Sequence, residues 1–237
     1  MRLQSCLISL LLPASLAQAE PSPTAGLVLS NRPVQLEKWE ESIAEFEHRD
    51  EETPPPQNPI LFVGSSSIRL WDLKDDFPDL VTVNNGFGGS TLADSIHFFE
   101  RHIAPYQPSA VVLYAGDNDI AKGLSPIEVL ADFVTLSVLI ERALPDTPVV
   151  FIAIKPSVKR WDMWPAMASA NQLIGDHCRQ APNLYFADIA AEMLADVEAS
   201  PPDLKWFVED GLHLSDWGYD QWAETIGAAL DAASSSD

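Results

Sequence analysis

Serine, histidine and aspartate side chains occur in this sequence in an arrangement that suits acyl transfer. Three consecutive serines follow Gly64, and Asp210 precedes His213 by three residues. A serine that attacks a carbonyl carbon needs a base within hydrogen-bond reach and a group that orients this base. With one turn of chain between them, Asp210 can hold one ring nitrogen of His213 and leave the other for a serine hydroxyl.

Donors for a developing oxyanion occur in two further stretches. Gly89 lies in the glycine-rich turn 85–91 and offers a bare backbone N–H group, whereas Asn118 offers a side-chain amide. Each stretch alone is a weak signal, because such serines, turns and Asp-x-x-His pairs also occur in ordinary loops. Ser65 or Ser66 also suits the simpler duty of capping the next helix. The joint occurrence of all these stretches favours a catalytic site.

Apolar runs bounded by turn residues predict the elements that carry these stretches. The predicted strands cover residues 60–64, 80–84, 110–114, 148–154 and 184–187. Helical spacing predicts helices between them, among them a short one over 68–73 and a longer one over 92–103. This alternation predicts an α/β fold, namely a three-layer αβα sandwich with a five-stranded parallel, flavodoxin-like sheet and helices on both faces. The serines, the glycine-rich turn and Asn118 then lie at the edge where parallel strands end.

The N-terminus is typical of an exported protein. Residues 1–19 combine a basic start, an apolar stretch and the ending Ala17-Gln18-Ala19, so we predict a signal peptide cleaved near Ala19 and a periplasmic or secreted product. The apolar stretch is too short to span a bilayer, which makes a membrane anchor the weaker alternative. The remaining chain is predicted to form a segment with an amphipathic helix, one α/β domain and a tail, over residues 20–57, 58–233 and 234–237.

Composition narrows the classes of partner. The formal net charge of −21 argues against nucleic acid and anionic lipid surfaces as partners. After signal cleavage Cys178 is the sole cysteine, and its helical spacing from other apolar residues predicts a buried position. His97 and His102 lack the HExxH spacing of a zinc site and are expected to be solvated or packed, while His48 and His177 are expected at the surface. We therefore predict no metal site.

Taken in order, these stretches resemble the blocks of the SGNH (GDSL-type) hydrolase superfamily. The resemblance covers nearly all of the chain after the signal peptide, with Gly116-Asp-Asn-Asp119 similar to a Gly-x-Asn-Asp block and residues 210–215 similar to the final block. The resemblance implies the SGNH hydrolase fold over 58–233. The site residues that it implies are Ser66 as nucleophile, the Ser66 and Gly89 N–H groups and the Asn118 amide as oxyanion donors, and His213 as base oriented by Asp210.

Two positions depart from the pattern of this superfamily. Ser65 stands where an aspartate usually precedes the nucleophile, and Ser90 stands where an aspartate often follows the oxyanion glycine. Neither change removes a catalytic group. The run of serines nevertheless leaves Ser65 and Ser67 as alternative nucleophiles.

The loop after the fourth predicted strand faces the same edge. Its Arg160, Trp161 and Trp164 are candidates for lining a substrate pocket. The alternative is that both tryptophans pack this loop onto the helix that follows.

The expected function is that of a serine esterase. It would cleave a carboxylic ester with a short acyl chain through an acyl-enzyme intermediate, without metal or organic cofactor. The substrate would be a small-molecule, glycan or lipid ester, and neither nucleic acid nor a stable membrane anchor is expected as a partner. One alternative is an acyltransferase that passes the acyl group to a sugar or lipid hydroxyl, and another is an inactive glycan-binding module that uses the Trp161 and Trp164 loop.

Overall fold

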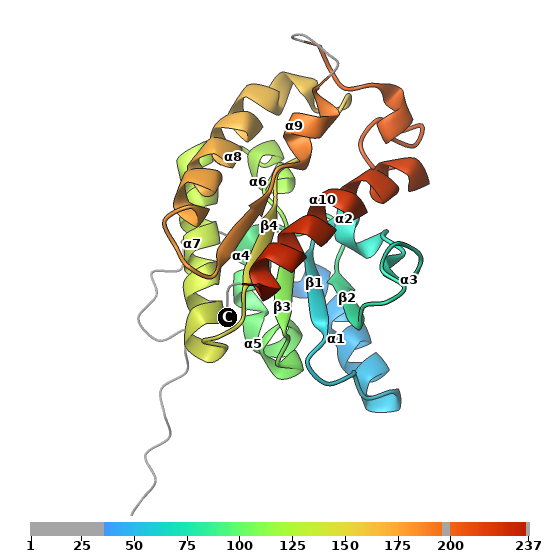
Figure 1. Cartoon of the computed structure of the whole chain (residues 1–237), viewed down its shortest axis with the longest axis vertical. Coiled ribbons are helices and arrows are strands. Elements are labelled where there is room, and N and C mark those ends of the chain that lie inside the picture. The colour runs from blue at the N-terminus through green and yellow to red at the C-terminus, as the bar shows by residue number, and fades with distance from the viewer. Residues whose placement is uncertain (1–35, 196–199, 236–237) are drawn as a thin grey trace, which may run out of the picture.

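The computed structural model describes residues 36–195 and 200–235, so the predicted signal peptide lies outside the described residues. Its centre is a parallel sheet of five strands in the order β2-β1-β3-β4-β5 (Figure 1). The strands are β1 Ile60–Gly64, β2 Thr82–Gly86, β3 Ala110–Tyr114, β4 Val149–Ile152 and β5 Leu184–Ala187. This is the strand order of flavodoxin-like doubly wound sheets, and it confirms the predicted fold class.

Helices cover both faces of the sheet. Figure 1 shows α10 in front of the sheet and α4 and α5 behind it. The front layer consists of α2 Ser66–Arg69, α3 Leu73–Asp76, α9 Ile189–Met193 and α10 Asp216–Ser234. The back layer consists of α4 Leu92–His97, α5 Phe99–His102, α7 Pro126–Ala143 and α8 Trp164–Cys178, and α6 Asp117–Ala121 follows β3 directly.

The core is divided between the two faces by the alternation of side chains along each strand. Leu61 and Val63 of β1 pack in the cluster under the back layer, whereas Phe62 packs in the cluster under the front layer. Cys178 belongs to the back cluster, as its spacing predicts, and burial raises its pKa to about 12. Within the described ranges, no helix combines the length and apolar composition needed to cross a bilayer.

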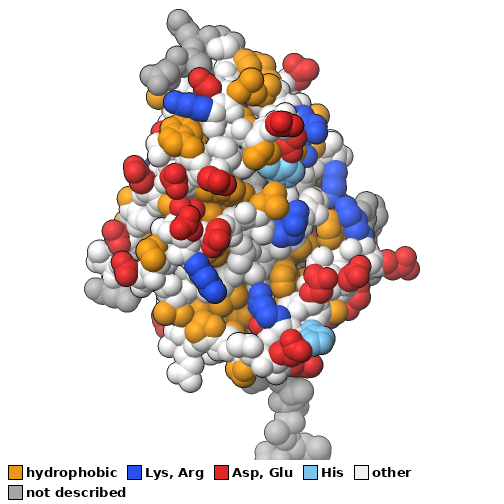
Figure 2. Space-filling view, turned by 90° about the vertical axis from the view of Figure 1, so that its right-hand side faces the viewer, with side chains coloured by type: hydrophobic (Ala, Val, Ile, Leu, Met, Phe, Trp, Pro, Cys, Tyr) orange, Lys and Arg blue, Asp and Glu red, His pale blue; other side chains and the backbone are white. Residues whose placement is uncertain are grey.

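The first helix packs against the turn that carries Gly89. Helix α1, Leu36–Glu52, buries Trp39 and Ile43 against Phe87 and Phe98. Its outer face carries glutamates, and Asp and Glu side chains spread over much of the face shown in Figure 2. Helix α1 thus supports the glycine-rich turn through Phe87.

Several boundaries differ from those predicted. The second strand, expected over 80–84, lies at Thr82–Gly86, and Leu80 and Val81 before it are exposed. The expected helix over 68–73 is two short helices, α2 and α3, and the first already begins at Ser66. The helix over 92–103 is broken at Phe98 into α4 and α5. Strand β4 ends at Ile152, two residues before its predicted end. Beyond it, the Ile154 N–H donates to Oδ1 of Asn171 at 2.7 Å, and Nδ2 of Asn171 donates to the Ile154 C=O at 2.8 Å. That amide replaces the neighbouring strand as the partner of the backbone.

Candidate active site

Strand β1 ends in a sharp turn that places Ser66 at the start of a helix. Gly64 has a φ of +140°, and a Cβ atom there would lie 1.9 Å from the carbonyl oxygen of Tyr114. Only glycine fits such a position. The Ser65 N–H donates to the same Tyr114 oxygen at 3.1 Å, and α2 then begins at Ser66.

Ser66, His213 and Asp210 form one hydrogen-bonded chain. The Oγ of Ser66 lies 2.9 Å from Nε2 of His213, and Nδ1 of His213 lies 2.6 Å from Oδ2 of Asp210. The other carboxylate oxygen, Oδ1, accepts the backbone N–H groups of Leu212 and His213 at 2.8 and 2.9 Å. The carboxylate therefore holds both its own loop and the imidazole ring.

The charge of Asp210 fixes the tautomer of His213. Partial burial acts to raise the pKa of this carboxyl, but hydrogen bonds from the His213 and Leu212 backbones and from the His213 ring lower it to about 2. An ionised carboxylate accepts only, so it keeps the proton on Nδ1 and leaves the lone pair of Nε2 directed at Ser66. This arrangement suits His213 as a general base.

The loop that carries Asp210 and His213 is closed on itself before the last helix. The Val208 N–H donates to the His213 carbonyl at 3.0 Å, and Gly211 has a φ of +63°. Ser215 then accepts the N–H of Gly218 and caps the start of α10. Phe207 and Leu214, at the two ends of the loop, pack in the front core cluster and hold the loop against the sheet.

The glycine-rich turn lies between Ser66 and Asn118. Its Phe87 N–H and Ser90 hydroxyl both donate to the Gly64 carbonyl, at 2.9 and 3.2 Å. The Asn118 amide donates from Nδ2 to the Ser90 carbonyl at 3.0 Å. Gly89 has a φ of +81°, which directs the backbone of the turn without strain. These bonds link the predicted oxyanion residues to the end of β1.

Asp119 joins the glycine-rich turn to the loop after β3. Its two carboxylate oxygens accept the N–H groups of Leu92 and Gly116 at 3.2 and 3.1 Å. Burial raises its pKa to about 7. Sequence reasoning assigned Asp119 no duty of its own, although its place in the Gly-x-Asn-Asp block was the available signal.

The two neighbours of Ser66 have different surroundings from it. The Ser67 hydroxyl accepts a hydrogen bond from Nζ of the buried Lys155 at 3.0 Å. The Ser65 hydroxyl is fully buried and has no hydrogen-bond partner in the described part of the chain. Of the three serines, Ser66 is the one that the structure brings to His213.

The three candidate pocket residues have different surroundings in the structure. Arg160 reaches back to Asp117 and Asn118, with N···O distances of 2.8 and 2.9 Å. Trp161 and Trp164 stack on each other with ring centroids 6.3 Å apart. Trp164 also packs against the core and lines a groove of about 370 Å³ together with residues of α8 and α9. This packing is the alternative that the sequence left open for the tryptophans.

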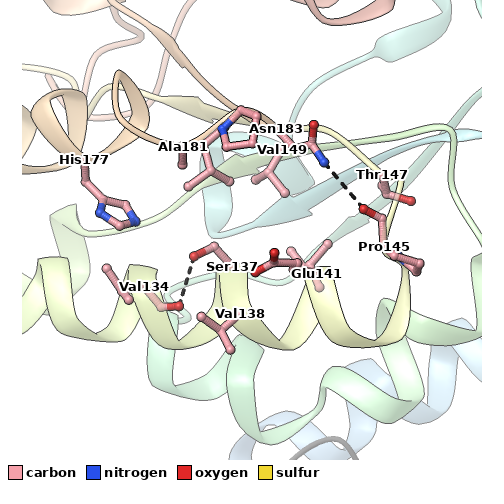
Figure 3. Close-up of a pocket in the computed structure, with 13 residues that line it drawn as sticks. Val134, Ser137, Val138, Glu141, Pro145, Thr147, Val149, His177, Ala181 and Asn183 are labelled. Atoms are coloured by element: carbon pink, nitrogen blue, oxygen red, sulfur yellow. Dashed lines mark hydrogen bonds between the residues drawn. The ribbon is translucent and has the colours of Figure 1, made fainter. Parts of the chain in front are cut away.

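A second cavity, of about 180 Å³, lies away from these residues. Figure 3 shows it beside α7, and its lining includes residues just before β4 and β5, at the edge opposite Ser66. His177 lines this cavity, half-buried and edge-on to Phe133 at 6.1 Å, so its expected surface position is only partly correct. Among the described residues, no group of three or more His, Cys, Asp or Glu side chains is arranged to hold a metal ion.

Solved structures with the same fold include hydrolases. A candidate platelet activating factor from Streptococcus pneumonia superposes with a TM-score of 0.72 at 21% identity, covering 82% of this chain and 94% of that one. A GDSL-like lipase from Bacteroides thetaiotaomicron gives 0.68 at 18% identity, covering 81% and 98%. A catalytic mutant of Axe2, an acetylxylan esterase from Geobacillus stearothermophilus, gives 0.58 at 17% identity, covering 74% and 95%. At these identities the likeness concerns the fold.

Comparison of the sequence with family profiles identifies the family of this chain. No curated protein matches the chain. The profile of the GDSL-like Lipase/Acylhydrolase family matches residues 69–221, which is more than half of the chain. The matched range begins three residues after Ser66 and includes the other members of the candidate site. The chain therefore belongs to the GDSL-like lipase/acylhydrolase family and is a hydrolase that acts on ester bonds.

Proposed function

We propose that the protein is a serine esterase in which Ser66 forms an acyl-enzyme intermediate. The observation that carries this proposal is the unbroken chain of hydrogen bonds from Ser66 through His213 to Asp210, at 2.9 and 2.6 Å. Such a chain delivers a nucleophile, a base and an orienting carboxylate in the order that acyl transfer needs.

The reaction proceeds in two steps with the same base. The Oγ of Ser66 attacks the ester carbonyl carbon while Nε2 of His213 takes the hydroxyl proton. The oxyanion is held by the N–H groups of Ser66 and Gly89 and by the Asn118 amide. The intermediate collapses as the C–O bond to the alcohol breaks and His213 returns its proton to the leaving oxygen. Water then attacks the acyl carbonyl while His213 takes its proton. The bond between the acyl carbon and Oγ breaks as His213 returns that proton to Oγ, which releases the acid and regenerates Ser66.

The substrates that we propose are small-molecule or glycan esters with short acyl groups. Axe2, which has the same fold, is an acetylxylan esterase, and this motivates acetylated sugars as first substrates to test. Ser66 and His213 are half-buried, and Asp210 keeps about a third of its side chain exposed, so the reacting groups are open to an ester in solution.

Purified protein is expected to release p-nitrophenol from p-nitrophenyl acetate and butyrate faster than from the decanoate. Product analysis by chromatography with xylose or glycerol present separates hydrolysis from transfer, since an acyltransferase yields the new ester at the expense of free acid. A protein that hydrolyses none of these esters and is not labelled by a fluorophosphonate contradicts the proposal and leaves a binding role.

Export is a separate proposal. It rests on the composition of residues 1–19, which combine a basic start, an apolar stretch and small residues before the cleavage position. Expression of the full chain in a Gram-negative host is expected to yield a periplasmic protein whose first residue is Glu20. N-terminal sequencing of that fraction checks this, and a protein that keeps Met1 contradicts it.

A further inference from the structure

Arg160 is held beside the oxyanion residues by two specific hydrogen bonds. Its Nη1 donates to Oδ2 of Asp117 at 2.8 Å, and its Nη2 donates to Oδ1 of Asn118 at 2.9 Å. The arginine side chain is 18% exposed, and that of Asp117 is 6% exposed. Two of the five N–H donors of the guanidinium group are therefore taken by Asp117 and Asn118.

The contact with Arg160 determines which way the Asn118 amide points. A guanidinium group has donors only, so the atom of Asn118 that faces it must be the carbonyl oxygen. The amide nitrogen then faces the Ser90 carbonyl, to which it donates at 3.0 Å. An amide NH₂ group has two hydrogens, and the second has no acceptor among the described residues. That hydrogen is available to a developing oxyanion, whereas a flipped amide would present an oxygen to the same negative charge.

A buried lysine lies near the same carboxylate oxygen of Asp117 that binds the arginine. Nζ of Lys155 lies 3.7 Å from Oδ2 of Asp117 and 3.0 Å from both the Ser67 and the Tyr114 hydroxyls. The Lys155 side chain is 1% exposed, and burial lowers its pKa. Asp117 thus joins a lysine anchored beside the nucleophile to the arginine that orients Asn118. The ion-paired group ties three loops together, each of which follows a different strand.

We propose that Arg160 is a positioning residue that orients the Asn118 amide for oxyanion stabilisation, and that Asp117, which also pairs with Lys155, holds Arg160 in place. This inference rests on the proposed function and deepens it. Arg160 acts through Asn118 and does not touch the ester. Without Arg160 the Asn118 amide is expected to lose its orientation. The chemical step should therefore slow, while substrate binding keeps its strength.

A double-mutant cycle on p-nitrophenyl acetate tests this coupling. Asn118→Ala is expected to lower kcat by about 10²-fold, the usual cost of one oxyanion donor. Arg160→Met, which keeps the stem but has no donors, is expected to lower kcat by about 10-fold or more with KM unchanged. The double variant should be no slower than Asn118→Ala alone, because the group through which Arg160 acts is already absent.

Two results would overturn the inference. One is a kcat loss for Arg160→Met that is as large in the Asn118→Ala background as in the parent. The other is a raised KM with unchanged kcat, which would make Arg160 a substrate-binding residue. Lys159→Met, an exposed neighbour, is the matched control and should keep both constants. If Arg160→Met does not fold by circular dichroism, Arg160→Leu, which also has no donors, replaces it in the same cycle and decides by the same criteria.

The outcomes separate this inference from the function on which it rests. Ester hydrolysis that depends on Ser66 while the cycle is additive removes the role of Arg160 and leaves the esterase proposal intact. Loss of the esterase proposal instead requires a parent protein that hydrolyses no ester.

Discussion

The variant Ser66→Ala is expected to lower kcat for p-nitrophenyl acetate by at least about 10⁴-fold, because no acyl-enzyme can form without the hydroxyl. KM should change little, since the Ser66 backbone N–H and the other oxyanion donors remain. His213 loses only one hydrogen bond, so the fold should be retained. Initial rates with the purified parent and variant, together with their circular dichroism spectra, measure both expectations.

Ser65→Ala is the matched control for this experiment. It removes a neighbouring hydroxyl that is fully buried and has no hydrogen-bond partner among the described residues. The Ser65 N–H, which bonds Tyr114, stays in place. The variant is therefore expected to keep the parental rate. The assignment of Ser66 as nucleophile would be contradicted by a Ser66→Ala protein whose kcat is within tenfold of the parental value. It would also be contradicted by a Ser65→Ala protein whose kcat falls by about 10⁴-fold.

The variant Asp210→Asn is expected to lower kcat by about 10³ to 10⁴-fold through the tautomer of His213. In the parent, Oδ1 accepts two backbone N–H groups, so the amide oxygen of the variant takes that position. The amide NH₂ group then replaces Oδ2 and faces Nδ1 of His213. It can only donate, so the ring proton moves to Nε2 and points at Ser66. The base is present but cannot accept a proton.

The pH dependence of stability provides a second measurement on Asp210→Asn. The pKa of Asp210 is lowered from 3.8 to about 2, so the ionised carboxylate stabilises the fold above about pH 4, and this contribution is lost as the pH falls toward 2. The difference in unfolding free energy between parent and variant should shrink over that interval, as measured by urea denaturation. Asp216→Asn, on the exposed first turn of α10, should keep the parental rate. An Asp210→Asn protein within tenfold of the parent contradicts the assigned role.

Much of the fold follows from local sequence signals. The five predicted runs lie at or overlap the five strands, the second being displaced by two residues, and alternation with helices leaves few arrangements other than a parallel doubly wound sheet. The ends of elements were less predictable, because they depend on distant partners. Strand β4 ends where Asn171, from the following helix, binds the backbone of Ile154. No pattern within the strand itself carries that information.

In the candidate site, too, some features are predictable from the sequence and others are not. Asp210 and His213 are predicted from their short spacing, and Ser66 is chosen among three serines by the resemblance to the SGNH superfamily. The structure joins the three residues by hydrogen bonds. The contacts of Arg160 and Lys155 depend instead on the conformations that these long side chains adopt in the folded protein. Arg160 was expected to line a pocket, yet its guanidinium binds Asp117 and Asn118, more than forty positions earlier in the chain.

The identity of the nucleophile is tested most directly by peptide mapping after covalent labelling. The protein is treated with a fluorophosphonate, digested, and analysed by tandem mass spectrometry, which locates the phosphonyl group within the run of three serines. The adduct is expected on Ser66 in the parent and in Ser65→Ala, and no adduct is expected in Ser66→Ala. An adduct on Ser65 or Ser67, or ester hydrolysis by a protein that takes no label, would contradict the account.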